Sequence, residues 1–275
     1  MSWQVTCLVP FQSGGNGDVY LGRKSDTNEH VAVKFLRDSN IPHLKKGFTR
    51  EVRVLARQLD GMVPILGWNM NADRPFYVMR YLRRGNLSQH AGKLSDTTLH
   101  AVATQLARTL ANLHSANEIH GDLKPDNILV TEEGHLQVAD PLGIGTLFTV
   151  LFSENRGGTP GYWAPEIAAG ASISHAGDVY SYGATLYHLL MACAPKDGQQ
   201  LDLAVRCWER APAIREVIAA CCQRDPVVRP TIQEVLRLLN GDSWAQIEKS
   251  RQQQKQLTGV FALGLLGLLA FALAA

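Results

Sequence analysis

Three glycines near the start of the sequence are spaced in a way that suits phosphate binding. The stretch QSGGNGDVY contains Gly14, Gly15 and Gly17, followed by Val19, among residues of strand character. Because glycine has no side chain, its backbone can approach phosphate oxygens closely and direct N–H groups at them. An ordinary glycine-rich hairpin turn would give the same pattern. The glycines alone therefore leave both interpretations open.

A lysine and a glutamate further along the chain form a second pair of interest. Lys34 lies in the strand-like run VAVK, and Glu51 lies on the helix that we expect next. A lysine within a strand is usually a solvated edge residue, and a glutamate on a helix is usually a surface charge. Together they suggest an ion pair, because a lysine that holds nucleotide phosphates needs a carboxylate to fix its flexible side chain.

The run HGDLKPDN at residues 120–127 is the most specific feature of the sequence. It resembles the catalytic loop of eukaryotic-type protein kinases, which reads HRDxxxxN and in serine/threonine members commonly HRDLKPEN. Other motifs of that family are present in the same order, and the resemblance covers roughly residues 8–240. They are the glycine-rich loop, VAVK, Glu51, Asp140, GTPGYWAPE at 158–166, DVYSYG at 178–183, and Arg229.

The resemblance implies a role for each matching residue. Asp122 would orient and deprotonate the substrate hydroxyl, and Lys124 would neutralise charge on the γ-phosphoryl group of ATP. Asn127 and Asp140 would bind Mg²⁺ through oxygen atoms. Met79 would be the gatekeeper of the adenine pocket, followed by a hinge at residues 80–82. The implied ATP-binding residues are Gly14, Gly15, Gly17, Val19, Ala32, Lys34, Glu51, Met79, Tyr81 and Leu82.

Other matches concern the scaffold and the class of substrate. Glu166 and Arg229 resemble the structural ion pair of the family, and Asp178 resembles the helix residue that braces the catalytic loop. Thr159 and Lys124 match residues typical of serine/threonine kinases. The resemblance therefore implies transfer of the ATP γ-phosphate to hydroxyl groups of protein substrates. The compact domain and the apolar end of the chain also resemble bacterial kinases of this type.

Several positions depart from the family pattern. Gln12 replaces the first glycine of the phosphate loop, and Asn16 replaces the aromatic residue at its tip. Gly121 replaces the arginine of HRD and so removes the cation that pairs with a phosphorylated activation loop. Pro141 follows Asp140 where the family has DFG, and because proline fixes φ we expect a stiffer segment. The lysine and both aspartates are kept, so we expect an enzyme, with an ATP-binding pseudokinase scaffold that recruits partners to a membrane as the alternative.

Residue periodicity predicts an α+β protein with a strand-rich part followed by a helix-rich part. We expect a kinase domain at 1–240, with an N-lobe at about 1–82 and a C-lobe at about 83–240. A helix with Phe48, Val52, Leu55 and Leu59 on one face separates the first two predicted strands, and a longer helix begins after the N-cap residue Ser95. The predicted strands are 31–36, 76–82, 128–130 and 136–138, and the later helices are 178–192, 213–223 and 231–240.

Composition excludes some classes of protein. Of the 275 residues, 45% are hydrophobic, so the chain can bury a core and is not intrinsically disordered. The 27 basic and 25 acidic residues are spread over the sequence, which argues against a nucleic-acid partner. No two of the five cysteines form a CxxC pair, so we expect reduced thiols rather than a zinc or redox site.

The end of the sequence predicts a membrane anchor. Residues 257–275 contain no charged residue, and at about 1.5 Å per residue a helix of this length just crosses a bilayer. The polar residues 241–256 read as a juxtamembrane linker, and Lys249, Arg251 and Lys255 favour a cytoplasmic location for the kinase domain. We therefore expect a single-pass transmembrane helix at 257–275. A helix buried in the soluble fold is the alternative.

Overall fold

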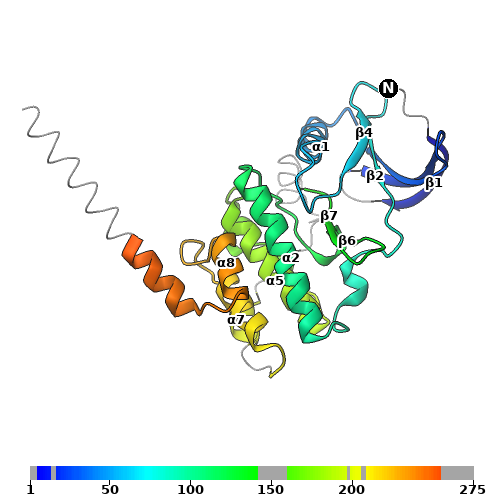
Figure 1. The fold of residues 1–275 in the computed structure, drawn as a ribbon. Coiled ribbons are helices and arrows are strands. Elements are labelled where there is room, and N and C mark those ends of the chain that lie inside the picture. Colours follow the sequence, from blue (N-terminus) through cyan, green and yellow to red (C-terminus); the bar gives the residue numbers. More distant parts are fainter. Residues whose placement is uncertain (1–4, 14–16, 142–159, 197–198, 206–208, 255–275) are drawn as a thin grey trace, which may run out of the picture.

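The computed structural model describes residues 5–13, 17–141, 160–196, 199–205 and 209–254. Within these residues the chain forms two lobes, which Figure 1 shows as a sheet with one helix at the upper right and a group of helices below it. The strand-rich N-lobe and helical C-lobe agree with the predicted bilobal α+β fold. Residues 81–86 connect the last strand of the sheet to the C-lobe.

The N-lobe is built on an antiparallel sheet of five strands in the order β1-β2-β3-β5-β4 among the described residues. Helix α1 (Pro42–Leu55) follows β3 and covers the sheet, and Phe48 of α1 packs on Tyr77 of β5 with ring centroids 5.5 Å apart. The strands are β1 (Val5–Ser13), β2 (Gly17–Lys24), β3 (His30–Leu36), β4 (Ile65–Asn69) and β5 (Phe76–Arg80).

The C-lobe is built around α2 (Asp96–Ser115), which packs against α5 (His175–Met191) and α8 (Ile232–Leu239). Leucines 99, 106, 110 and 113 of α2 are fully buried, as the helical period of the sequence requires. Further helices among the described residues are α4 (Pro165–Ala168), α6 (Leu201–Ala204) and α7 (Pro212–Cys221), with 3₁₀ turns η1 (Leu87–His90), η2 (Pro125–Asn127) and η3 (Pro160–Tyr162).

A two-stranded hairpin, β6 (Ile128–Val130) and β7 (Leu136–Val138), lies between the lobes in Figure 1. Val138 exchanges backbone hydrogen bonds with the segment that joins α1 to β4: its N–H donates to Gly61 O at 2.8 Å, and its carbonyl accepts from Val63 N at 2.9 Å. The hairpin immediately follows the run 120–127 and ends two residues before Asp140. It therefore fixes two chemically important segments against the N-lobe.

The predicted helices and strands are present, but the strand predicted at 76–82 ends at Arg80, and β4 was not among the predicted strands. The ends of the helices depend on capping. The side chain of Ser95 accepts a hydrogen bond from Thr98 N and begins α2, as the sequence predicts. Helix α5 begins three residues before the predicted Asp178, because the side chain of Ser174 caps it by accepting from Gly177 N. Helix α1 ends at Leu55, so Leu59 packs on the core from the following loop rather than from the helix.

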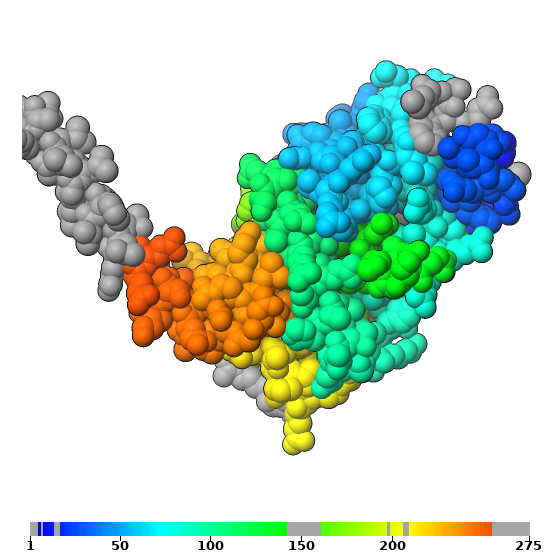
Figure 2. Space-filling model, in the orientation of Figure 1, coloured from blue at the N-terminus to red at the C-terminus, as the bar shows by residue number. Residues whose placement is uncertain are grey.

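The segment expected to be a polar linker contains a helix at residues 244–254 that packs on the C-lobe. Ile247 is fully buried, and Trp244 packs partly buried against the same core. Figure 2 shows this segment in orange, in contact with the body of the protein. At least residues 244–254 therefore belong to the folded domain.

In the part of the chain that the structure describes, no helix has both the length and the apolar character needed to span a bilayer. The predicted transmembrane helix at 257–275 lies outside the described residues.

Candidate active site

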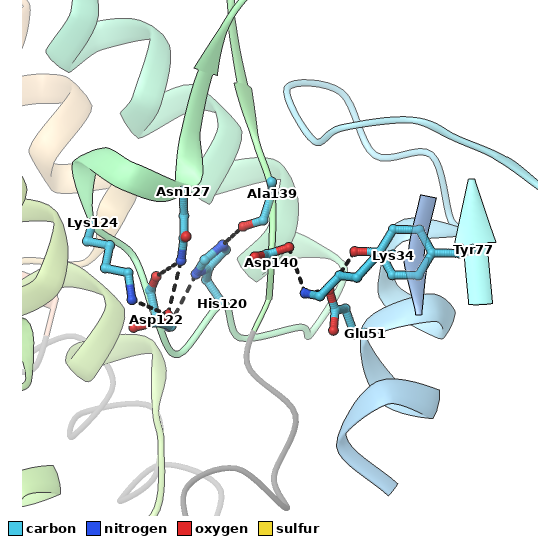
Figure 3. A network of polar contacts seen from close by, with 9 residues as sticks. All are labelled: Lys34, Glu51, Tyr77, His120, Asp122, Lys124, Asn127, Ala139 and Asp140. Carbon is cyan, nitrogen blue, oxygen red and sulfur yellow. Dashed lines mark hydrogen bonds and ion pairs between the residues drawn. The ribbon is translucent and has the colours of Figure 1, made fainter. Parts of the chain in front are cut away.

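Lys34, Glu51 and Asp140 meet in one buried ion-pair network, which Figure 3 shows. The ammonium of Lys34, on β3, lies 2.6 Å from Glu51 Oε1 of α1 and 2.9 Å from Asp140 Oδ1, just after β7. The hydroxyl of Tyr77 donates to the same Glu51 oxygen at 2.6 Å. Lys34 is 5% exposed and Glu51 is 1% exposed, so neither is the solvated surface charge that each residue type usually is.

Burial and the neighbouring charges shift the pKa values of this network. Burial raises the pKa of Glu51 to about 7, with Lys34 and Tyr77 acting in the opposite direction. Burial also disfavours the charged form of Lys34, but the carboxylates of Asp140 and Glu51 outweigh it and raise the pKa of Lys34. For Asp140, burial is outweighed by Lys34, which lowers its pKa. Lys34 and Asp140 are therefore both charged at neutral pH.

The loop at residues 120–127 brings Asp122, Lys124 and Asn127 into direct contact. Lys124 Nζ donates to Asp122 Oδ2 at 2.8 Å, and Asn127 Nδ2 donates to the same oxygen at 3.0 Å. Asn127 Nδ2 also donates to the backbone carbonyl of Asp122 at 2.7 Å, which closes the loop on itself. The carboxylate of Asp122 is thus held in one position by two donors.

Asp178 of α5 fixes the start of this loop through hydrogen bonds to its backbone. Its carboxylate, which is buried, accepts from the backbone N–H of His120 and of Gly121, both at 2.8 Å. It also lies 2.9 Å from His114 Nε2 at the end of α2. Burial alone would raise the pKa of Asp178, but these hydrogen bonds outweigh it and lower the pKa. Asp178 braces the loop, as the sequence resemblance implies.

His120 joins the loop to the residue that precedes Asp140. Its Nδ1 accepts from Asp122 N at 3.2 Å, so the proton lies on Nε2, which donates to Ala139 O at 2.9 Å. The ring is fully buried, and burial lowers the pKa of His120. A neutral imidazole with one tautomer therefore links Asp122 to the chain at Asp140, as Figure 3 shows.

Several of the predicted ATP-binding residues lie on neighbouring strands of the N-lobe sheet or directly after it. Val19 on β2 pairs in register with Lys34, and Ala32 on β3 pairs with Met79 on β5. Tyr81 and Leu82 follow β5 directly. Phe11 of β1 meets the ring of Tyr81 edge-on, with centroids 5.7 Å apart. Gly14 and Gly15 lie outside the described residues.

Two further observations concern the packing beside the glycine-rich turn and the oxygen donors of the site. A Cβ atom at Gly17 would lie 2.4 Å from Phe35 O, so only glycine allows the two strands to approach this closely. Asn127 uses Nδ2 for both of its hydrogen bonds described above, which turns its carbonyl oxygen elsewhere. With the part-exposed carboxylate of Asp140 it supplies the oxygen donors that Mg²⁺ prefers.

A family model described as a protein kinase domain matches residues 12–238. The chain belongs to the protein kinase domain family. Its similar proteins include the probable serine/threonine-protein kinase drkD of Dictyostelium discoideum, 32% identical over 249 residues, which are 83% of this chain and 19% of that protein.

Bacterial kinases are among the similar proteins. The DNA damage-responsive serine/threonine-protein kinase RqkA of Deinococcus radiodurans is 31% identical over 243 residues, 83% of this chain and 35% of the relative. The probable serine/threonine-protein kinase CPE1738 of Clostridium perfringens is 29% identical over 276 residues, 90% of this chain and 40% of the relative. The chain thus spans less than half the length of each of these curated relatives.

Two residues at or next to the departures from the protein kinase pattern have a left-handed backbone conformation. Gly121, in place of the HRD arginine, has φ +81, a conformation that glycine adopts without strain. Asp140 has φ +56 although it is not a glycine, and it directly precedes Pro141. Asp tolerates this left-handed conformation better than most residues, and its ion pair with Lys34 helps to hold it. The rest of the DFG-like segment lies outside the described residues.

The scaffold pair of the kinase domain is formed as the sequence implies. Arg229 donates to both oxygens of Glu166, at 2.6 and 2.7 Å, and it is 3% exposed. This bidentate contact ties the segment around α4 to the turn before α8. Thr159, the other residue that pointed to serine/threonine specificity, lies outside the described residues.

Sequence reasoning missed two residues of the site. Tyr77 supports Glu51, and His114 supports Asp178. A signal existed for Tyr77, since strand alternation places it on the same face of β5 as the predicted gatekeeper Met79. His114 carries no such signal, because it meets Asp178 across 64 residues of sequence.

Proposed function

We propose that the protein is a serine/threonine protein kinase that transfers the γ-phosphoryl group of ATP to hydroxyl groups of proteins. The observation that carries the proposal is the convergence of two groups. Lys34, Glu51 and Asp140 form one, Asp122, Lys124 and Asn127 form the other, and His120 joins them. Phosphoryl transfer depends on positioning and on charge stabilisation, which such an arrangement supplies.

Each residue has a defined task in this proposal. Lys34 binds the α and β phosphates while Glu51 fixes its side chain. Asp122 orients the acceptor hydroxyl and takes its proton, and Lys124 leaves Asp122 to neutralise the γ-phosphoryl group. Asn127 and Asp140 would hold Mg²⁺, which would offset the negative charge of the phosphates.

The test is transfer of label from γ-phosphate-labelled ATP to the protein itself or to generic protein acceptors, with Mg²⁺ present. Asp122→Asn and Lys34→Met should each lower the rate about a hundredfold or more, since each removes a group that acts on the transferring phosphate. The matched controls are Asp73→Asn and Lys45→Met, which change the same charges at exposed positions. Their rates should equal that of the wild type.

The second candidate function is an ATP-binding scaffold without transfer. It predicts the same ATP affinity but no label on any acceptor. Retention of all three of Lys34, Asp122 and Asp140 favours the enzyme, because loss of one of them is the usual mark of a pseudokinase. Binding of ATP by the wild type with no detectable transfer would contradict the enzymatic proposal.

The proposed location is the cytoplasmic face of a membrane, with residues 257–275 as a single-pass anchor. The support is the uncharged apolar run itself, together with Lys249 and Lys255 before it. The test is extraction of the full chain from membranes at alkaline pH, compared with residues 1–254. The full chain should resist extraction while the shorter chain is soluble. An insoluble shorter chain would instead support a helix buried in the fold.

A further inference from the structure

Three arginines of the α1 region surround one glutamate beside the catalytic loop. Arg50 and Arg53 are one helical turn apart on α1, and Arg57 follows two residues after its last residue. All three contact Glu118, two residues before His120. Glu118 Oε1 lies 3.1 Å from Arg57 Nη1, and Oε2 lies 3.5 Å from Arg53 Nη2 and 3.9 Å from Arg50 Nη2. We call these four residues the Glu118 cluster.

Backbone contacts strengthen the Glu118 cluster. Arg50 Nη2 donates to Ile119 O at 2.6 Å, and Arg57 Nη1 donates to Ala116 O at 3.0 Å. The side chains of Arg50 and Glu118 are each 10% exposed, whereas that of Arg53 is 65% exposed. Water therefore screens Arg53 strongly, and the contacts of Arg50 and Arg57 carry most of the attachment.

The cluster lies where it can control the geometry of the site. Arg50 is the chain neighbour of Glu51, and Ile119 is the chain neighbour of His120. The hydrogen bond from Arg50 to Ile119 therefore links the helix that carries Glu51, the partner of Lys34, to the chain just before the catalytic loop. If α1 moves away, Glu51 leaves Lys34 and the proposed phosphate-binding lysine loses its fixed position.

Gly121 bears on how α1 could depend on phosphorylation. It has no side chain, so the cation that in many protein kinases would pair with a phosphorylated activation loop is absent at this position. The arginines of the α1 region already have the carboxylate of Glu118 as a partner, so they too do not require a phosphate group.

We propose that Glu118 is a positioning residue that holds α1 where Glu51 meets Lys34, so that transfer does not depend on phosphorylation of the chain. The proposal rests on the proposed kinase function for its effect on rate. Its effect on α1 does not depend on that function.

The first experiment measures kcat and KM for ATP on the full chain after phosphatase treatment. Glu118→Gln should lower kcat roughly 3- to 30-fold, because it removes the anion that the three arginines share and so weakens the attachment of α1. Glu118→Asp keeps the charge and should recover most of the rate. Glu209→Gln changes the same charge at an exposed position and should have no effect. Wild-type rates should be equal with and without phosphatase.

The second experiment measures amide hydrogen exchange in the absence of nucleotide. Glu118→Gln should speed exchange in α1 and in residues 116–119, while exchange in α8 stays as in the wild type. A purely structural role would speed exchange throughout the domain. If the wild type shows no transfer at all, the proposed function fails, and this second measurement still decides whether Glu118 holds α1.

If Glu118→Gln does not fold, a variant that changes the packing less can test the same proposal. Arg57→Met removes the 3.1 Å ion pair from a side chain that is 42% exposed, and it should give the same pattern at smaller size. The proposal is overturned if the folded variant matches Glu209→Gln in both kcat and exchange. It is equally overturned if phosphatase treatment abolishes the activity of the wild type.

Discussion

Arg251 donates to both carboxylate oxygens of Glu234, at 2.7 and 2.6 Å, and so fastens the helix at 244–254 to the start of α8. The same guanidinium donates to Arg229 O at 2.8 Å and lies over the ring of Trp244, 5.0 Å from its centroid. Arg229 is the residue that holds Glu166. The segment beyond the predicted kinase domain therefore supports the backbone of its structural ion pair.

Arg251→Ala should destabilise the domain by about 1–3 kcal/mol, because a bidentate, partly buried contact and a backbone hydrogen bond are lost together. Urea unfolding of residues 1–254 measures this. Lys249→Ala, at an exposed position on the same helix, is the matched control and should change stability by less than about 0.5 kcal/mol. Equal unfolding midpoints for the two variants would mean that the segment does not contribute to folding.

Gly121→Ala should lower the free energy of unfolding by about 1–2 kcal/mol. The residue has φ +81, and a residue with a Cβ atom is strained in that conformation. The strain falls within the catalytic loop, so kcat should fall as well. Asn117→Gly tests the converse, since Asn117 has φ +57 and glycine relieves that strain. Thermal unfolding of both variants checks the prediction, and a Gly121→Ala protein as stable as the wild type would argue against strain at this position.

Gly17→Ala should weaken ATP binding roughly tenfold, because the added Cβ would lie 2.4 Å from Phe35 O and must push the start of β2 away. Titration of the protein with Mg²⁺-ATP gives the dissociation constant. Gly22→Ala is a control in the same strand, where the nearest atom is the Val5 side chain at 2.6 Å. It should lower stability but leave ATP affinity unchanged, so an equal loss of affinity in both would point to general damage.

His120 should make the domain less stable in mild acid. Burial keeps the pKa of His120 below the usual 6.5. The unfolded chain takes up this proton near pH 6.5, and the folded protein takes it up only at lower pH. Between these values the unfolded state holds more protons, so the free energy of unfolding falls as the pH falls.

His120→Asn should reduce the slope of unfolding free energy against pH by up to about 1.4 kcal/mol per pH unit below pH 6.5. Glu51, whose pKa is raised to about 7, contributes a slope of opposite sign, since its stabilisation is lost as the pH rises through that value. That contribution is present in both proteins, so the difference between them isolates His120. The exposed His135→Asn is the control, and parallel curves for all three proteins would contradict the prediction.

The sequence predicted those parts of the site that depend on local pattern. Residues 128–130 and 136–138 are strands as predicted, and the strand around Lys34 begins one residue earlier than expected. Alternation along β3 and the helical period of α1 place Lys34 and Glu51 on facing surfaces. Their 2.6 Å contact follows from two separate periodicities.

The contacts that the sequence could not predict join segments with no common period. Glu118 meets Arg57 across 61 residues, and Arg251 meets Glu234 across 17 residues. The glutamines at 252–254 and the cations nearby give residues 241–256 the composition of a linker. Composition carries no information on which side chain finds a partner. The buried Ile247 and the bidentate contact of Arg251 hold this segment on the domain.

The hydrogen bond from His120 to Ala139 has a consequence for motion. The proposed proton acceptor and the proposed metal-binding carboxylate share one bridge, so thermal displacement of one carries the other along with it. Any displacement that leaves this hydrogen bond intact would keep the spacing between these two carboxylates nearly constant. A change that breaks the hydrogen bond would instead let the two carboxylates move independently of each other.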